Sequence, residues 1–418
     1  MSYELKLMQM KKLLKKTTNN SIEVEKIVKA SAPSYEENWL AAGLTKTENV
    51  HGIVYERTIL YDSNYKHGDV LLSKLNAAVN MWENFGEEHP LSPKILNKLV
   101  FFDTETTGLK GAGTLIFLLG FIEQIGSSFK LTQYVLPGPD HEPAFLYASK
   151  FWEKEKTVVT YNGKSFDIPM LETRWTMNRK VLPPLLKHEQ IDLLHGSRRI
   201  WKDEIGAFKL TIIEEEKLGF YRDGDIPGHL APIIYQDAVK NGRAEVLMKV
   251  LTHNEWDILS LVALYIRSTE LLLGGNDSEN ATTHTNIGKW FADLKNYNRS
   301  RHIFENVIDE YGTDHPITHF HFGFIMKRDQ MYEKAVFSFK IAAEKLSGRQ
   351  RIIALEELAK LFEHKLKNLD LALMFTKKAI GYISSDTKLT KKFRASADFE
   401  FRKREIRILR KLFPGETQ

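Results

Sequence analysis

An apolar stretch of the chain ends in two carboxylates that are two residues apart. Residues 99–109 read LVFFDTETTGL, so Asp103 and Glu105 follow directly on four apolar side chains. Such a run predicts a buried strand, and residues two apart on a strand point to the same face. Because like charges at close range repel each other, the pattern indicates that a positive partner lies between these two acids.

Two later stretches supply further polar side chains of the same kind. TYNGKSFDIPML, residues 160–171, places Asp167 after a short apolar strand, where it could also be the N-cap of a helix. THNEWDILSLVALY, residues 252–265, predicts a helix with an apolar stripe. His253 and Asp257 share one face of that helix because they are four residues apart; a surface His–Asp pair is the alternative.

These side chains form one candidate set of four acids, Asp103, Glu105, Asp167 and Asp257. If the four carboxylates converge on one site, divalent cations must neutralise them. Carboxylate oxygens select Mg²⁺ or Mn²⁺, which also bind phosphate oxygens. Two such ions are the usual arrangement for hydrolysing a phosphodiester bond. We therefore expect two Mg²⁺ or Mn²⁺ ions at this set.

The acids lie in the middle one of three regions. Residues 1–98 have a mixed pattern that is partly helical, including a short basic amphipathic helix in MSYELKLMQMKKLLKK that packs on the body or contacts nucleic acid. Residues 99–273 alternate strand-like and helix-like segments, which predicts an α/β domain with a mixed sheet flanked by helices. GGNDSEN, residues 274–280, predicts a loop, and residues 281–418 have a purely helical pattern.

Local patterns locate the elements that must position the acids. KLVFFD, TLIFLLGFIE and FKLTQYVLP predict three strands, of which the last two form a hairpin at IGSS, and TVVTYN predicts a fourth. Helical patterns run from Pro143 to about Glu153 and from Glu245 to Ile266.

Small and aromatic residues recur in the helical region with a spacing of 35 to 37 residues. The recurring sets are Gly288, Gly323 and Ala359, then Ser300, Ala335 and Ala372, then Phe304, Phe339 and Thr376. The spacing is close to the roughly 34 residues of a tetratricopeptide helix pair, and an irregular bundle is the alternative. Residues 386–411 predict a helix that caps the repeats and has a basic outer face.

The composition of the chain restricts the classes of protein to which it can belong. The chain has 418 residues, a net charge of +5 and no cysteine. The slight positive excess permits a polyanionic partner, and the missing thiols exclude disulfides and thiolate metal sites and fit a reducing compartment. Leu115–Ile122 is too short to cross a membrane, and the first residues lack the apolar core of a secretory signal. We expect a cytoplasmic protein.

The three motifs together resemble those of a known family. DTETTG, NGKSFD and HNEWD follow the order and context of the DEDD-type exonucleases of the ribonuclease-H-like (DnaQ-like) superfamily. The wider stretches, with IDLLHGSRRIW and DIPG, resemble the YprB branch, to which a mitomycin-repair exonuclease with tetratricopeptide repeats belongs. The resemblance implies a ribonuclease-H-like fold and 3′–5′ hydrolysis of single-stranded or gapped DNA in repair. It also implies a helicase partner at the repeats.

The resemblance assigns a role to each candidate residue. Asp103 would bridge both ions, while Glu105 and Asp257 would complete the shell of the first and Asp167 would hold the second. His253 would be the general base, at a position where the commonest patterns have a tyrosine four residues before the last aspartate or a histidine five before it. A histidine pKa near about 6.5 suits proton abstraction at neutral pH.

Further residues would contact the substrate. The turn with Thr106, Thr107 and Leu109 would cradle the terminal nucleotide. Asn162 would bind the phosphate or order its own loop, and Asp192 reads as a helix cap. Arg198, Arg199 and Lys202 would follow the backbone phosphates or form a solvated helix face. An RNA-processing exonuclease, and an adaptor that recruits a helicase on a nuclease platform, are the alternative functions.

Overall fold

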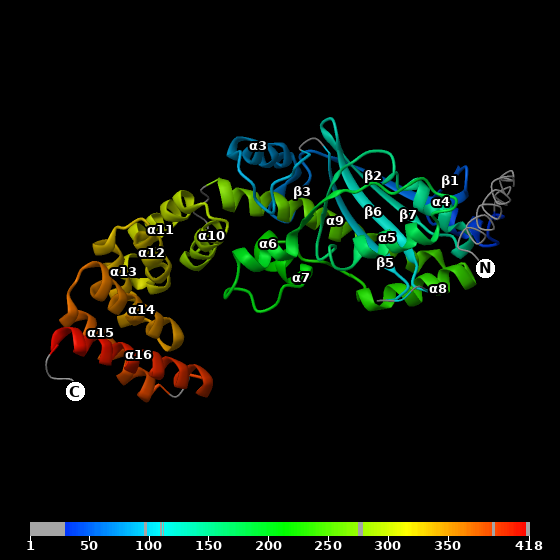
Figure 1. Cartoon of the computed structure of the whole chain (residues 1–418). Coiled ribbons are helices and arrows are strands. Elements are labelled where there is room, and N and C mark those ends of the chain that lie inside the picture. Colours follow the sequence, from blue (N-terminus) through cyan, green and yellow to red (C-terminus); the bar gives the residue numbers. More distant parts are fainter. Residues whose placement is uncertain are drawn as a thin grey trace, which may run out of the picture.

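The structure, a computed structural model, describes residues 30–95, 98–108, 111, 113–274, 279–386 and 389–414. It has a body built on a β-sheet and an extended row of helices that leads away from the body to the C-terminal end (Figure 1). The basic helix predicted within the first 16 residues lies outside the described residues. Within the described residues, no helix is long and apolar enough to cross a membrane.

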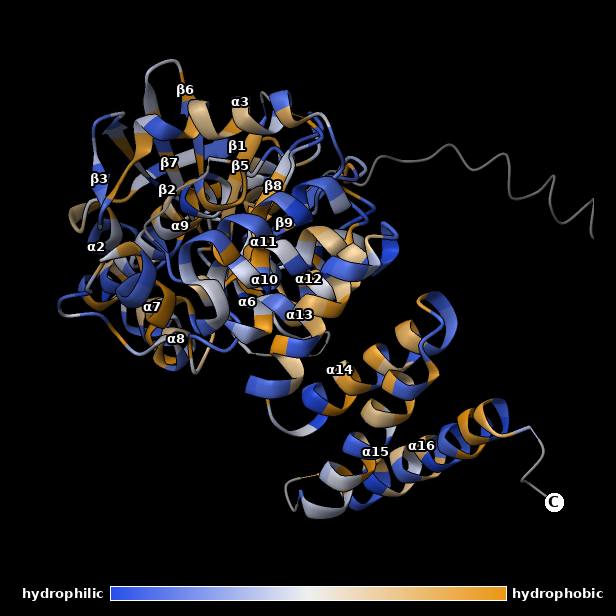
Figure 2. Ribbon diagram, turned by 90° about the vertical axis from the view of Figure 1, so that its left-hand side faces the viewer, coloured by the Kyte–Doolittle hydropathy of each residue, from blue (hydrophilic) through white to orange (hydrophobic). Residues whose placement is uncertain are grey.

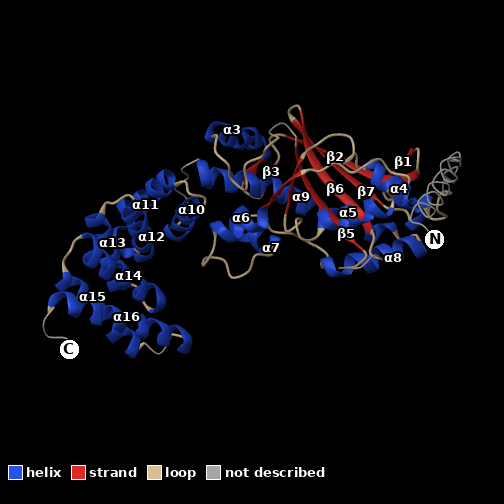
Figure 3. Ribbon diagram, in the orientation of Figure 1, coloured by secondary structure: helices blue, strands red, loops and turns tan. Residues whose placement is uncertain are grey.

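The body contains a sheet of seven strands in the order β1-β2-β7-β6-β5-β8-β9 (Figure 3). The strands are β1 (Thr45–Asn49), β2 (Gly52–Asp62), β5 (Leu99–Thr106), β6 (Ile116–Ile125), β7 (Ser128–Val135), β8 (Thr157–Thr160) and β9 (Glu189–Asp192). A separate small hairpin consists of β3 (Lys66–His67) and β4 (Val70–Leu71). β1, β2, β7, β6 and β5 run antiparallel to their neighbours, whereas β8 and β9 continue the sheet in parallel from β5. The predicted mixed sheet is therefore confirmed.

Helices cover both faces of this sheet. They are α2 (Glu36–Ala41), α3 (Leu75–Phe85), α4 (Glu142–Ala148), α5 (Asp167–Met177), α6 (Leu193–Ile200), α7 (Leu210–Ile213), α8 (Ala231–Asn241) and α9 (Ala244–Leu273). Alternation along β5 assigns its side chains to two cores. Phe101 packs in one core with Ile258 and Val262 of α9, whereas Phe102 packs in the other core with residues of α4 and α5. Asp103 and Glu105 have the parity of Phe101 and therefore face α9.

The N-terminal part of the chain contributes to the same sheet. β2 pairs with β7 from Tyr55 opposite Val135 to Asp62 opposite Ser128. The sheet thus extends before residue 99, where the sequence analysis expects the α/β domain to begin. The predicted strands β5 to β8 and the hairpin at IGSS are confirmed, while the helix expected from Pro143 to about Glu153 is the shorter α4.

The C-terminal helices form three antiparallel pairs followed by one last helix. They are α10 (Ala281–Asp293), α11 (Tyr297–Tyr311), α12 (Pro316–Arg328), α13 (Tyr332–Lys345), α14 (Gly348–Lys360), α15 (Leu369–Ser385) and α16 (Lys391–Leu412). Orange hydrophobic and blue hydrophilic residues alternate along α14 and α16 (Figure 2), as expected for amphipathic helices packed on one side.

The recurring small and aromatic residues mark where the paired helices touch. A methyl group built at Gly288 of α10 would lie 2.6 Å from the ring of Phe304 of α11. The equivalent distance is 2.8 Å between Gly323 of α12 and Phe339 of α13. The predicted repeat of helix pairs thus has a physical basis in these close approaches.

The last helix differs from expectation in one respect. α16 packs on the last pair, as expected for a capping helix, with Phe401 and Ile408 buried. However, its basic face is not purely an outer face, because Arg407 and Lys411 donate to the buried carboxylate of Glu363. Part of the positive charge of α16 therefore pairs with a buried acid of the repeat region instead of facing solvent.

Candidate active site

The C-terminal half of β5 carries the first two acids. Asp103 pairs across the sheet with Gly120 of β6, and Glu105 lies two residues further along the same face. Both side chains are partly buried, and both face α9. The two acids are thus fixed by a regular strand rather than by a loop, which limits how far apart they can move.

Asp167 is brought to β5 by the loop that follows β8. It is the first residue of α5, not the N-cap, which is Phe166. The hydroxyl of Thr104, between the two acids of β5, donates a hydrogen bond to the Asp167 carboxylate. Asp192 holds the loop from the other side, since its carboxylate accepts hydrogen bonds from the backbone N–H groups of Asn162 and Lys164. Asp192 also caps α6, as predicted.

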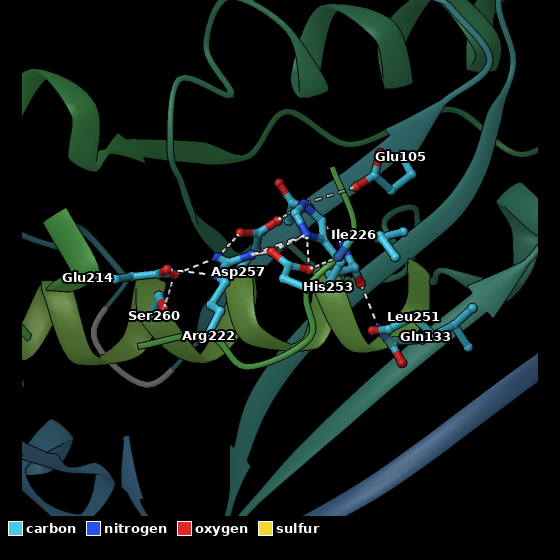
Figure 4. A network of polar contacts seen from close by, with 12 residues as sticks. Glu105, Gln133, Glu214, Arg222, Ile226, Leu251, His253, Asp257 and Ser260 are labelled. Carbon is cyan, nitrogen blue, oxygen red and sulfur yellow. Dashed lines mark hydrogen bonds and ion pairs between the residues drawn. The ribbon is translucent and has the colours of Figure 1, made fainter. Parts of the chain in front are cut away.

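α9 supplies the remaining predicted residues from one face. Nε2 of His253 lies 3.4 Å from a carboxylate oxygen of Asp257 and 4.0 Å from one of Glu105. One ligand atom each from Glu105, His253 and Asp257 fit within 4.8 Å of one another, and this is the only such group of metal-binding side chains among the described residues. The structure therefore brings Glu105, His253 and Asp257 together (Figure 4). Asp103 and Asp167 lie close enough to these acids for their charges to interact.

Electrostatics show that this cluster favours a cation. Burial, and then the other carboxylates of the site, raise the pKa of Asp103 well above its ordinary value. The same causes raise the pKa of Glu105 to about 8. Burial raises the pKa of Asp167 to about 6 despite its hydrogen bond from Thr104. Buried carboxylates whose pKa values are raised in this way are ready ligands for a hard divalent ion.

One positive partner, Arg222, belongs to the chain itself and was missed in the sequence. Its guanidinium donates to both carboxylate oxygens of Glu214, at 2.7 and 2.6 Å, and to Asp257. Although burial disfavours its charged form, these bonds raise the pKa of Arg222 above the ordinary value. Arg222 therefore anchors Asp257 from the side away from Glu105. The sequence predicted that metal ions alone neutralise the acids. Arg222 shows that the chain itself supplies part of the positive charge.

Asp225, also missed as a site residue, orients His253. Nδ1 of His253 lies 2.7 and 2.9 Å from the two carboxylate oxygens of Asp225. Nη1 of Arg222 also lies 3.2 Å from Nδ1, but the two contacts with Asp225 are shorter. They favour the tautomer with its proton on Nδ1, which leaves the lone pair on Nε2 facing Glu105 and Asp257. The one signal in the sequence was the stretch DIPG, which begins at Asp225 and was noticed for its resemblance alone.

A row of polar side chains crosses the sheet and ends at Asp103. The amide of Asn254 on α9 donates to Asp103 at 2.8 Å. Gln133 of β7 donates to Oδ1 of Asn254 at 2.8 Å and to the carbonyl of Leu251 at 2.7 Å (Figure 4). Because Gln133 occupies the oxygen of Asn254, the amide nitrogen is turned towards Asp103. Gly120, which lies between Asp103 and Gln133 in the sheet, leaves the space for Asn254.

Three of the residues predicted to contact substrate instead form hydrogen bonds within or beside their own turns. The hydroxyl of Thr106 donates to the carbonyl of Gly108, and Thr107 accepts from the backbone of Leu115. Both hydroxyls thus stabilise their own turn, and Leu109 lies outside the described residues. Asn162 has a left-handed backbone with φ of 65° and orders the loop before Asp167.

Arg198 and Arg199 are exposed on α6 and line a cleft together with residues of α10. Lys202 lies just beyond them and lines the same cleft. The predicted basic side chains are therefore gathered at the junction between the body and the helical region.

Two comparisons with known proteins agree with this geometry. Residues 100–269 match the model of the RNase_H superfamily, a range that includes every acid of the site. The chain is also 36% identical over 352 residues to a Bacillus subtilis protein named YprB and described as uncharacterized. That alignment covers 82% of this chain and 84% of the relative. The chain therefore belongs to the family of YprB, and its residues 100–269 are the part that matches the RNase_H superfamily.

Proposed function

We propose that this protein is a metal-dependent 3′–5′ exonuclease of the DEDD type that hydrolyses DNA, with a role in repair. A nucleic-acid-cleaving enzyme is what the superfamily supports, and the finer assignment rests on the site. The observation that carries it is the group formed by Glu105, His253 and Asp257, together with the electrostatic interaction of Asp103 and Asp167 with these acids. The pKa values of Asp103, Glu105 and Asp167 are raised. The 3′–5′ direction and the preference for DNA come from the motif resemblance.

The donor set fits a pair of hard divalent ions. Asp103 would contact both, Glu105 and Asp257 would complete the first site, and Asp167 would hold the second. Two Mg²⁺ or Mn²⁺ ions, when bound, supply charge neutralisation at the phosphate and a more acidic water. Arg222 would keep one oxygen of Asp257 engaged and so fix the direction of the other.

His253 supplies the proton acceptor in this proposal. Asp225 holds the proton on Nδ1, so Nε2 is free to take a proton from water on the side of Glu105. The Asp225 carboxylate then stabilises the charged imidazolium that results.

Hydrolysis assays test the proposal directly. Labelled single-stranded and gapped DNA and matched RNA would be incubated with Mg²⁺, Mn²⁺ or a chelator, with the label placed to distinguish 3′ from 5′ degradation. We expect metal-dependent release of nucleotides from the 3′ end of DNA. Asp103→Ala should lower the rate by at least about 10²–10³-fold, because the ions that Asp103 would hold supply the stabilisation of the developing charge. Asp370→Ala, an exposed aspartate of α15, is the matched control.

Two outcomes would contradict parts of this assignment. Faster hydrolysis of RNA than of DNA at equal salt would favour the RNA-processing alternative. Unchanged activity in Asp103→Ala would contradict the site itself.

A second proposed role, binding of a partner such as a repair helicase, is favoured by a feature of the helix pairs. A cleft between α11 and α13 contains the exposed side chain of Phe337, which is 61% exposed. Deleting residues 281–418 is a poor test, because Trp290 and Phe291 of α10 pack in the core of the body. Phe337→Glu, which should abolish complex formation and leave hydrolysis unchanged, is the sharper variant.

A further inference from the structure

A cleft of about 590 Å³ lies between α6 of the body and α10, the first helix of the helical region. Figure 1 shows the two helices side by side at the junction of the two parts. The cleft has an apolar floor that includes Leu91 and Leu294. Its basic lining consists of Lys164, His195, Arg198, Arg199, Lys202 and Lys289.

The positive charge of the cleft is mostly uncompensated. Across the described residues, Lys164, Arg198, Lys202 and Lys289 make no ion pair within 4.0 Å, whereas Arg199 pairs with Asp293. Asp192 is the one acid in the lining; its carboxylate accepts hydrogen bonds from two backbone N–H groups of the loop before Asp167 and one of α6, and it lies 4.0 Å from Nε2 of His195. Unpaired cations that converge on one concavity attract a polyanion.

The two walls of the cleft are held together, so the cleft is preformed. Asn286 of α10 donates to the carbonyl of Lys202 at 2.7 Å. The rings of Trp290 and Phe291 of α10 pack at a tilt against His89, which itself stacks on Trp82 of the body. A preformed site binds without the entropic cost of ordering its walls, which favours a specific role over an accidental gap.

One loop of the chain connects the cleft with the acid cluster. Lys164 lies in the loop that leads directly into Asp167, and the same loop is held by Asp192 at the cleft wall. A strand that occupies the cleft would therefore pass the loop of Lys164 before it reaches Asp167. The one tryptophan in the lining, Trp290, is only 4% exposed, so it does not present a ring on which a base could stack.

We propose that this cleft binds the sugar–phosphate backbone of a single nucleic-acid strand whose end lies at the acid cluster. The inference rests on the proposed function as a nuclease. It makes α10 a part of the substrate path and assigns Lys289, Lys202, Arg198 and Lys164 to phosphates. Binding through phosphates alone is independent of base sequence.

The test compares a long strand with a substrate too small to reach the cleft. The long strand is a labelled oligothymidylate, and the small substrate is the p-nitrophenyl ester of thymidine 5′-monophosphate. The variants are Lys289→Gln and the double variant Lys202→Gln/Lys289→Gln. Lys340→Gln, an exposed lysine of α13 outside the cleft, is the matched control.

We expect the cleft variants to raise KM for the long strand and to leave kcat/KM for the ester unchanged. The slope of log binding constant against log salt should become shallower by roughly 0.7 for each phosphate contact removed. Lys340→Gln should match the parent in all three measurements. An oligocytidylate should respond in the same way as the oligothymidylate.

Three results would overturn the inference while leaving the nuclease assignment intact. The first is a parent-like KM and salt slope for the long strand in the double variant. The second is an equal loss for the ester, which would place these lysines in the acid cluster. The third is unchanged strand binding together with lost binding of polyglutamate, which would assign the cleft to an acidic protein. If the parent hydrolyses neither substrate, the proposed function itself fails.

Discussion

Replacing Gly120 by alanine should impair both stability and activity, although glycine and alanine differ by a single methyl group. The methyl group would lie 2.0 Å from Oδ1 of Asn254 and 2.5 Å from Cδ1 of Ile258, far inside an ordinary contact of 3.4–4 Å. Asn254 cannot simply turn away, because Gln133 donates to the same oxygen. α9 must therefore move away from the sheet.

The size of the effect follows from these contacts. Overpacking of a buried site costs about 1–3 kcal/mol of unfolding free energy. The hydrogen bond from Asn254 to the Asp103 carboxyl group would be lost or lengthened as well, and a hydrogen bond between uncharged groups contributes about 0.5–1.5 kcal/mol. A shift of about 1 Å in the position of His253 or Asp257, on the same helix, can lower the rate by about 10²-fold. We therefore expect a destabilisation of about 2–4 kcal/mol and a rate reduced by about 10²-fold.

The assay combines denaturant unfolding with hydrolysis of the long strand. Gly138→Ala is the matched control, because its methyl group would have nothing within 4 Å. In an Asn254→Ala background the same Gly120→Ala change should cost less, since the nearest atom is gone. Parent-like stability and rate in Gly120→Ala would refute the reasoning that α9 is held against β6 at this point.

Three further predictions concern charged side chains. Asp225→Asn should reduce kcat by about 10²–10⁴-fold with little change in unfolding free energy, because His253 loses the carboxylate that fixes its tautomer; equal kcat in the variant and the parent would contradict this. Arg222→Gln should destabilise the fold by about 3–5 kcal/mol, because buried Glu214 loses its partner, and denaturant unfolding measures the loss. Burial alone would raise the pKa of Glu363, but hydrogen bonds from the basic residues of α16 lower it to about 2. Its stabilisation is therefore complete above its ordinary pKa of 4.5 and is lost as the pH falls towards 2. In Glu363→Gln, the loss of helical circular-dichroism signal between pH 4.5 and 2 should be smaller than in the parent. The same acid-unfolding curve in the variant and the parent would contradict this prediction.

The sequence predicted those parts of the fold that follow from the order of apolar and polar residues within one strand or helix. The alternation in LVFFDTET and the stripe of Ile258, Leu261 and Val262 fix β5 and α9 whatever surrounds them. The recurrence of Gly288 and Gly323 marked the helix pairs, since a small residue is needed where a phenylalanine ring of the partner helix lies. The acids were found because two of them share one strand face.

The parts that were missed depend on contacts between distant segments. β2 has a mixed burial pattern, and its pairing with β7 joins residues more than 70 positions apart, such as Thr58 and Thr132. Arg222 lies in a segment without regular structure, and only the folded chain brings it to Glu214 and Asp257. Asn254 was passed over because its role depends on Gln133 across the sheet rather than on its neighbours in the sequence.

Anomalous scattering from crystals soaked in Mn²⁺ would test the account most directly. Burial, and then the charges of the neighbouring carboxylates, raise the pKa values of Asp103 and Glu105. We predict one peak among Asp103, Glu105 and Asp257 and a second between Asp103 and Asp167. An empty cluster at saturating Mn²⁺, with its carboxylates still protonated or turned to other side chains, would contradict the account.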